Sequence, residues 1–230
     1  MANHAHDGHR DGMKKKYIQH GYEQFREHEL LEILLYYGIS RKDTNEIAHN
    51  LIKRFGNIHG VLNASYEQLE DVDGVGEHTA VLLKLCGDLV RHFGLQDHKK
   101  GTVLKTTDEI GEYLLPYFWG EQTEVLRMLT LDNCDRVLTV TEISQGLNNA
   151  SDVNLRIIKH RAALDGATQV VLAHNHPQGF AFPSETDKLA TAVICQELKN
   201  INVILRDHIV VSDTDYVSMF NTPQLTHLFL

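Results

Sequence analysis

Three side chains between residues 173 and 187 have the types and spacing of metal ligands. His174 and His176 are two residues apart on an expected extended segment, which points both imidazoles to the same side of the backbone. Ser184-x-x-Asp187 is typical of a helix start, with Ser184 as N-cap and Asp187 in the first turn. The helix dipole there favours a charged carboxylate. We therefore expect His174, His176 and Asp187 to bind one divalent cation.

Two neutral imidazoles and one carboxylate would leave one tetrahedral position of a zinc ion open. That open position distinguishes catalytic zinc sites from structural ones. Water bound there would titrate near neutrality and could attack a carbonyl or phosphoryl centre. The pattern therefore predicts one Zn²⁺ per chain and hydrolytic chemistry, and it requires a general base that the three ligands do not supply.

The whole pattern resembles a known motif. His174-x-His176-Pro177, followed by Pro183-Ser184-x-x-Asp187, resembles the JAMM (MPN+) metalloprotease motif, and the intervening Asn175 with the later Gly179 is similar to its bacterial RadC branch. The resemblance covers most of the chain. It implies a zinc-dependent metallopeptidase that cleaves amide or isopeptide bonds of a peptide or protein substrate.

The resemblance also indicates a base. In JAMM proteins a glutamate at the start of the domain's first strand is the general acid/base, and residues 123–132 match that place, so Glu124 is the first candidate. Glu142, near the end of the next expected strand, is the alternative, and Glu121 is the third choice. Ser184 matches the family's serine, which is thought to stabilise the oxyanion.

The elements that must position these residues form an α+β or α/β domain over residues 106–230, expected as a mixed-sheet JAMM (MPN) domain. Apolar runs and turn signals predict strands at 125–131, 136–143, 168–173, 203–205, 209–211 and 216–218, and helices from Thr106 or Thr107, over 152–165 and from Ser184. Asp207 and His208, expected between two strands, resemble the family's Asp-His pair, for which we predict either a buried role behind the ligands or a role in the turn, rather than direct ligation. The tail from Thr222 is expected at the surface.

Residues 21–95 predict a small all-α domain. Its segment 72–76, apolar-x-Gly74-x-Gly76 before a helix, resembles the helix-hairpin-helix module of RadC proteins. Gly74 and Gly76 permit a tight turn whose amides could receive a DNA backbone phosphate. The alternative is a purely structural turn, because Asp71 and Asp73 flank it with negative charge. Residues 1–20 are expected to be a disordered His-rich leader, and residues 96–105 a polar linker.

Composition limits the alternatives. A net charge of −9 argues against tight, sequence-blind phosphate binding, so any DNA contact should be weak and local. Three widely spaced cysteines and no apolar run long enough for a membrane span predict a soluble cytoplasmic protein without a membrane partner. Two other functions stay open: a non-catalytic DNA-associated or protein-interaction module with a zinc site, and a metal-dependent nuclease linked to DNA repair. The sequence does not define the oligomeric state.

Overall fold

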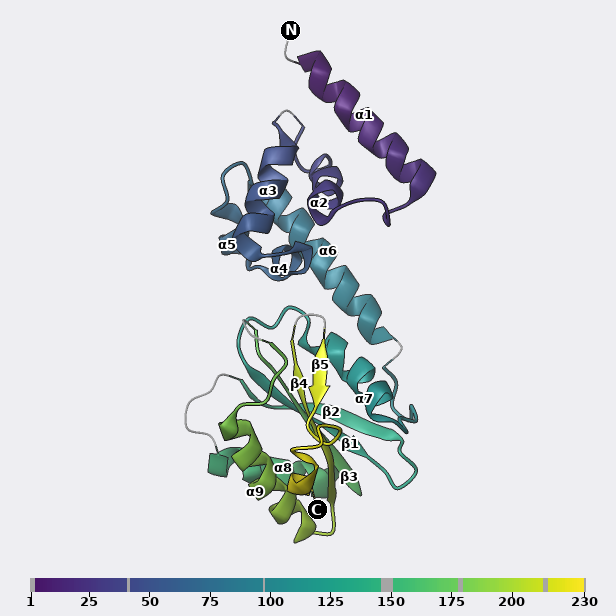
Figure 1. Cartoon of the computed structure of the whole chain (residues 1–230), viewed down its shortest axis with the longest axis vertical. Helices are drawn as coiled ribbons and strands as arrows, with labels where there is room; N and C mark the ends of the chain where they lie inside the picture. The colour runs from purple at the N-terminus through teal and green to yellow at the C-terminus, as the bar shows by residue number, and fades with distance from the viewer. Residues whose placement is uncertain are drawn as a thin grey trace. The chain divides into compact units, whose positions relative to one another are not determined.

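The protein divides into two compact units in a computed structural model, Met1–Val90 and Arg91–Leu230 (Figure 1). The structure describes residues 3–40, 42–96, 98–145, 151–177, 180–212 and 215–229. In that part of the chain, no helix is long and apolar enough to cross a membrane.

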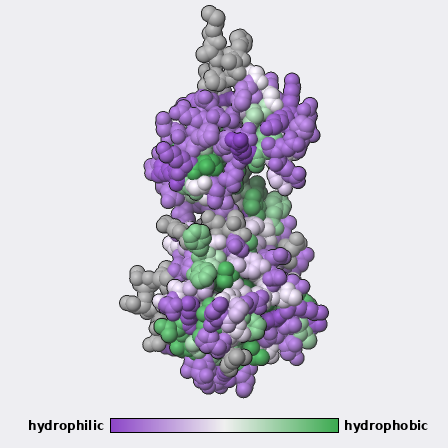
Figure 2. All heavy atoms as spheres, viewed as in Figure 1, coloured by the Kyte–Doolittle hydropathy of each residue, from purple (hydrophilic) through white to green (hydrophobic). Residues whose placement is uncertain are grey.

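The first unit is helical and has its own core. Its helices are α1 (Asn3–His20), α2 (Glu27–Leu35), α3 (Thr44–Phe55), α4 (Ile58–Asn63), α5 (Tyr66–Glu70) and the start of α6 (Glu77–Gln96). Local capping fixes several helix ends: the Asp43 side chain accepts from the Asn45 amide, and Ser65 forms a capping box with Gln68. Hydrophilic residues cover most of the visible face of this unit (Figure 2).

The leader differs from the expectation that residues 1–20 are disordered, because most of it forms helix α1. The Arg10 guanidinium donates to the backbone carbonyls of Ser40 and Lys42 at 3.1 and 2.9 Å. His9 Nε2 lies 3.1 Å from Oε1 of Glu32, a carboxylate on α2 that is only 2% exposed. Polar contacts to α2 and the turn after it therefore order a segment whose composition offers little apolar surface to bury.

The second unit contains a mixed five-stranded sheet with helices on both faces. Its elements in chain order are α7 (Thr107–Leu114), η1 (Leu115–Phe118), β1 (Val125–Leu131), β2 (Val137–Gln145), α8 (Ser151–Asp165), β3 (Gln169–Asn175), α9 (Glu185–Lys199), β4 (Ile204–Val211), β5 (Tyr216–Ser218) and η2 (Thr226–Phe229). The strand order is β2-β1-β3-β4-β5; β3 and β4 are parallel, and the other neighbours are antiparallel. The predicted α+β class with a mixed sheet is confirmed.

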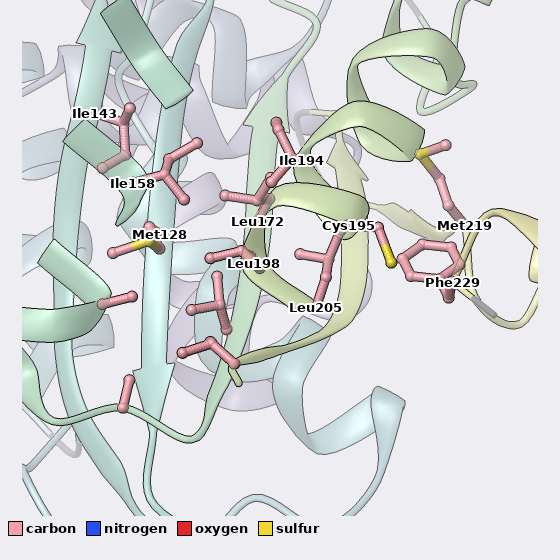
Figure 3. Close-up of a cluster of buried hydrophobic side chains, with 14 of the residues drawn as sticks. Met128, Ile143, Ile158, Leu172, Ile194, Cys195, Leu198, Leu205, Met219 and Phe229 are labelled. Atoms are coloured by element: carbon pink, nitrogen blue, oxygen red, sulfur yellow. The ribbon is translucent and has the colours of Figure 1, made fainter. Parts of the chain in front are cut away.

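Successive residues of each strand alternate between two apolar layers. Met128 and Leu172 point toward α8 and α9, where they pack with Ile158 and Leu198 (Figure 3). Their strand neighbours, among them Leu129, face the opposite layer formed with α7 and η1. The α8/α9 face is thus distinct from the α7 face, and a side chain's position in its strand decides which one it joins.

Two connecting segments pack more closely than the sequence predicted. In the expected linker over 96–105, the Gly101 amide donates to the Val137 carbonyl and the Val137 amide donates to the Thr102 carbonyl, both at 2.8 Å. Leu104 is only 4% exposed. The tail from Thr222, expected at the surface, buries Phe229 against α9 in the same cluster as Leu198. In both cases apolar side chains of the segment are buried by tertiary contacts that the local sequence pattern does not reveal.

The two short strands expected at 203–205 and 209–211 are one continuous strand, β4. Its pairing with β3 shifts by one residue, because Val170 is opposite Leu205 and Val171 is opposite Asp207. Arg206 is therefore an extra residue in β4, as in a bulge. The consequence is that Asp207 and His208 lie within the sheet rather than in a turn, and both are buried.

Candidate metal centre

The end of β3 and the first turn of α9 bring three ligand atoms together. His174 Nε2 and His176 Nε2 are 3.1 Å apart, and Asp187 Oδ2 lies 3.5 and 3.8 Å from them, respectively. Zinc bonded to imidazole nitrogen or carboxylate oxygen at roughly 2.0–2.1 Å would have its ligands about 3.3 Å apart in a tetrahedron. The three separations fall around that value, so these donor atoms fit one small divalent cation.

Both imidazoles are oriented through their other ring nitrogen. His176 Nδ1 lies 3.2 Å from the Phe180 carbonyl oxygen, which can only accept a hydrogen bond. Nδ1 of His176 therefore carries the proton, and the lone pair of Nε2 faces His174 and Asp187. This arrangement, in which the outer nitrogen donates to a carbonyl, is typical of metal-binding histidines.

His174 is oriented by a buried chain of three hydrogen bonds. Its Nδ1 is 2.9 Å from His208 Nε2, His208 Nδ1 is 2.6 Å from Thr191 Oγ1, and the Thr191 hydroxyl donates to the Asp187 carbonyl at 2.6 Å. One direction satisfies every group: His174 donates to His208, and His208 donates to Thr191. The chain thus leaves His174 Nε2 unprotonated. Burial and the neighbouring His174 lower the pKa of His208 to about 3, which keeps His208 neutral.

Thr191 is not among the site residues predicted from the sequence, although a signal was present. Thr191 lies four residues after Asp187 on α9, one helical turn further on, where a hydroxyl can bond back to the carbonyl. It is fully buried. A threonine in a helix that begins with a candidate ligand therefore indicated a supporting position, but its partner His208 comes from β4 and depends on the sheet.

Asp187 is held by the helix start that the sequence predicted. The Ser184 amide and hydroxyl both donate to Asp187 Oδ2, at 2.7 and 2.6 Å, and the Asp187 amide donates back to Ser184 Oγ at 3.2 Å. Burial opposes ionisation of this carboxyl, but the nearby His174 and the hydrogen bonds from Ser184 outweigh burial and lower the pKa of Asp187 below the usual range. Asp187 is therefore a carboxylate, the form that binds a cation.

Glu124 lies beside the two histidines at the entrance to β1. A carboxylate oxygen of Glu124 and one nitrogen each of His174 and His176 all lie within 4.8 Å of one another. Burial raises the pKa of Glu124, although the nearby histidines oppose the shift. A half-buried carboxyl with a raised pKa has the properties of a general base.

The two rival glutamates lie elsewhere. Glu142 and Glu121 both accept from the Arg127 guanidinium, at 3.1 and 2.6 Å. In the sheet, Arg127 is opposite Glu142 on one side and Ala173 on the other, and Ala173 belongs to the α7 layer. His174 is opposite Leu126, whose side chain lies on the α8/α9 face. Paired residues share a face of a sheet. Glu142 therefore projects from the face opposite His174.

The glycine turn before α6 belongs to the helical unit. Gly74 has φ +90°, and a Cβ there would lie 2.6 Å from Ile47 Cδ1, so the turn and its packing both require glycine. A Cβ at Gly76 would meet no heavy atom within 4 Å. The hollow beside the turn is lined by Lys42 and by the carboxylates Glu70, Asp71 and Asp73. Gly179, which contributed to the motif, lies outside the described residues.

The sheet brings two histidines and a glutamate, and the first turn of α9 an aspartate, to one point, which defines an α+β domain with a candidate metal centre. The description "RadC-like JAB domain" matches residues 104–225, and "UPF0758 N-terminal" matches residues 10–81. The chain belongs to the RadC-like JAB (UPF0758) family.

Curated relatives cover nearly the whole chain. A UPF0758 protein of Fusobacterium nucleatum is 32% identical over 226 residues, which are 95% of this chain and 97% of that protein. UPF0758 proteins of Shewanella halifaxensis and Shewanella piezotolerans are 31% and 32% identical over 208 residues, 90% of this chain and 92% of each relative. These similarities therefore extend over both units.

Proposed function

We propose that this protein is a zinc-dependent metallopeptidase that hydrolyses amide or isopeptide bonds in a peptide or protein substrate. The observation that carries the proposal is the convergence of three oriented donor atoms with Glu124. Membership of the JAB family is consistent with it.

In the proposed site His174, His176 and Asp187 hold one Zn²⁺ per chain. The ion, when bound, acidifies water and polarises the carbonyl that is attacked. Three protein ligands leave a coordination position for water, which favours a catalytic over a purely structural role.

Glu124 is the proposed general acid/base. It accepts a proton from the attacking water and returns it to the leaving amine, which a carboxyl of raised pKa can do in both directions. Ser184 is the proposed oxyanion donor. Its hydroxyl proton is directed at Asp187 Oδ2 in this structure, so stabilising an oxyanion requires the hydroxyl to rotate.

The test compares zinc content and turnover in the same preparations. Wild type, Glu124→Gln and the matched control Glu142→Gln are loaded with zinc and assayed on peptide, isopeptide-linked and DNA substrates. We expect equal zinc in all three, peptide-bond cleavage by wild type and the control, and a loss of about 10²- to 10⁴-fold in kcat for Glu124→Gln. Cleavage of DNA alone would support a nuclease, and bound zinc without turnover would support a non-catalytic module.

A further inference from the structure

Asn175 lies between the two histidines in sequence, but its side chain bonds to the backbone next to Glu124. Its side chain is 4% exposed. Its Oδ1 accepts from the Val125 amide at 2.8 Å, and its Nδ2 donates to the Thr123 carbonyl at 3.1 Å. These two backbone groups flank Glu124 on either side. One side chain thus clasps the backbone on both sides of the candidate base.

The clasp lies where the strands stop pairing. The ladder between β1 and β3 runs from Leu131 opposite Gln169 to Leu126 opposite His174 and ends there. Beyond that point, the Asn175 amide supplies the hydrogen bonds that backbone groups supply within the ladder. Glu124 is therefore fixed to β3 through the residue that separates the two histidines.

We propose that Asn175 is a positioning residue that holds Glu124 at the metal centre. The inference rests on the proposed function, because it gives Glu124 a catalytic role. It explains how a base that precedes its strand keeps a defined place relative to His174 and His176, to which it is not adjacent in sequence.

Only an amide satisfies both partners. The Val125 N–H needs an acceptor and the Thr123 carbonyl needs a donor, which also fixes which end of the amide is oxygen. Aspartate has the same shape but would place a second carboxylate oxygen against the Thr123 carbonyl. Asn175→Asp therefore loses the bond to Thr123 and adds repulsion there, which opens the clasp and weakens the remaining bond to the Val125 amide, with little change in volume.

The experiment uses zinc-loaded full-length wild type, Asn175→Asp, Glu124→Gln and the double variant. Thr130→Val is the matched control, because Thr130 makes its side-chain bonds to the Thr139 carbonyl and Asp165 at the other end of β1. Zinc affinity, hydrogen exchange of the Val125 amide, kcat and KM on one cleavable peptide are measured for each.

We expect Asn175→Asp to keep its zinc affinity and KM, to exchange the Val125 amide faster, and to lose about 100-fold in kcat, as a small misplacement of a catalytic group can cause. The double variant should be no slower than Glu124→Gln, because Asn175 acts through Glu124. Thr130→Val should keep its kcat.

Three results would overturn the inference: an unchanged kcat in Asn175→Asp, an equal loss in the control, or a further loss when Asn175→Asp is added to Glu124→Gln. A fall in zinc affinity that accounts for the lost kcat would assign Asn175 to the ligands instead. A wild type without turnover would overturn the proposed function, and the Val125 exchange rate would then show separately whether the clasp exists.

Discussion

The candidate metal centre at the end of β3 and the glycine turn before α6 differ in what their polar groups face. At the centre, each imidazole donates through Nδ1 to an internal partner, and the free nitrogens converge on Asp187. At the turn, the adjacent hollow is lined by three carboxylates and one lysine. The first arrangement suits a cation. The second has more negative than positive charge, even though Arg54 pairs with Asp71 at 3.2 Å, and this excess disfavours a phosphate.

The comparison separates two uses of a short motif. The histidine motif is accompanied by supporting residues from other elements, His208 of β4 and Thr191 of α9. The glycine motif is explained by local geometry, since Gly74 accommodates a positive φ and the Ile47 side chain. A short motif supports a binding role when residues from other elements orient its side chains. It supports a structural role when backbone geometry and packing alone explain its residues.

The strongest test of the comparison is removal of a ligand. His176→Ala should lose bound zinc and all zinc-dependent turnover, because two donors cannot retain the ion through dialysis. Zinc per chain is measured by mass spectrometry, with the exposed His160→Ala as control. Equal zinc in both variants would place the ion elsewhere and remove the distinction between the two regions.

A smaller loss of zinc affinity is expected when a residue that orients a ligand is replaced and the ligands themselves are kept. His208→Leu deletes the acceptor for His174 Nδ1 and should weaken zinc binding by about 10- to 100-fold. Competition with a chromophoric chelator gives the affinity. An affinity equal to that of wild type would show that His208 fills space in the core without orienting the ligand.

At the turn, the expected effect is on stability and not on binding. Gly74→Ala forces a side chain into positive φ and against Ile47, and should destabilise the helical unit by about 2 kcal/mol or more. Gly76→Ala is the matched control, because its Cβ meets nothing within 4 Å. Thermal unfolding followed by circular dichroism compares them. Equal melting temperatures would contradict the packing explanation.

The smallest effect is expected on the affinity for duplex DNA. If backbone contact at the turn is limited by repulsion, Asp71→Asn combined with Asp73→Asn should strengthen duplex binding a few-fold, on the order of 1 kcal/mol or less, at low salt. Fluorescence anisotropy at two salt concentrations measures it. An unchanged affinity would remove the turn from the candidate nucleic-acid contacts.

Local signals in the sequence predicted the parts of the fold that depend on neighbouring residues. The helix start at Thr106 involves a capping partner three residues further on, Glu109, so spacing alone specifies it. Ser184 and Asp187 form the same kind of pair. The family resemblance, carried by residues of fixed spacing, correctly indicated the RadC-like JAB family.

Features that depend on distant partners could not be predicted in this way. The helical leader relies on carbonyls about 30 residues away, and the continuity of β4 relies on a bulge opposite β3. The choice between Glu124 and Glu142 depends on the face of the sheet from which each projects. That face follows from strand register, which the alternation within one strand does not reveal.

X-ray absorption at the zinc edge of the zinc-loaded full-length protein tests the central claim most directly. The account predicts two imidazole nitrogens and two oxygens at roughly 2.0–2.2 Å, one oxygen from Asp187 and one from water. In Asp187→Ala the imidazole signal should weaken or vanish with the metal. A thiolate at about 2.3 Å, four protein ligands, or a spectrum unchanged in Asp187→Ala would contradict an open two-histidine, one-aspartate site.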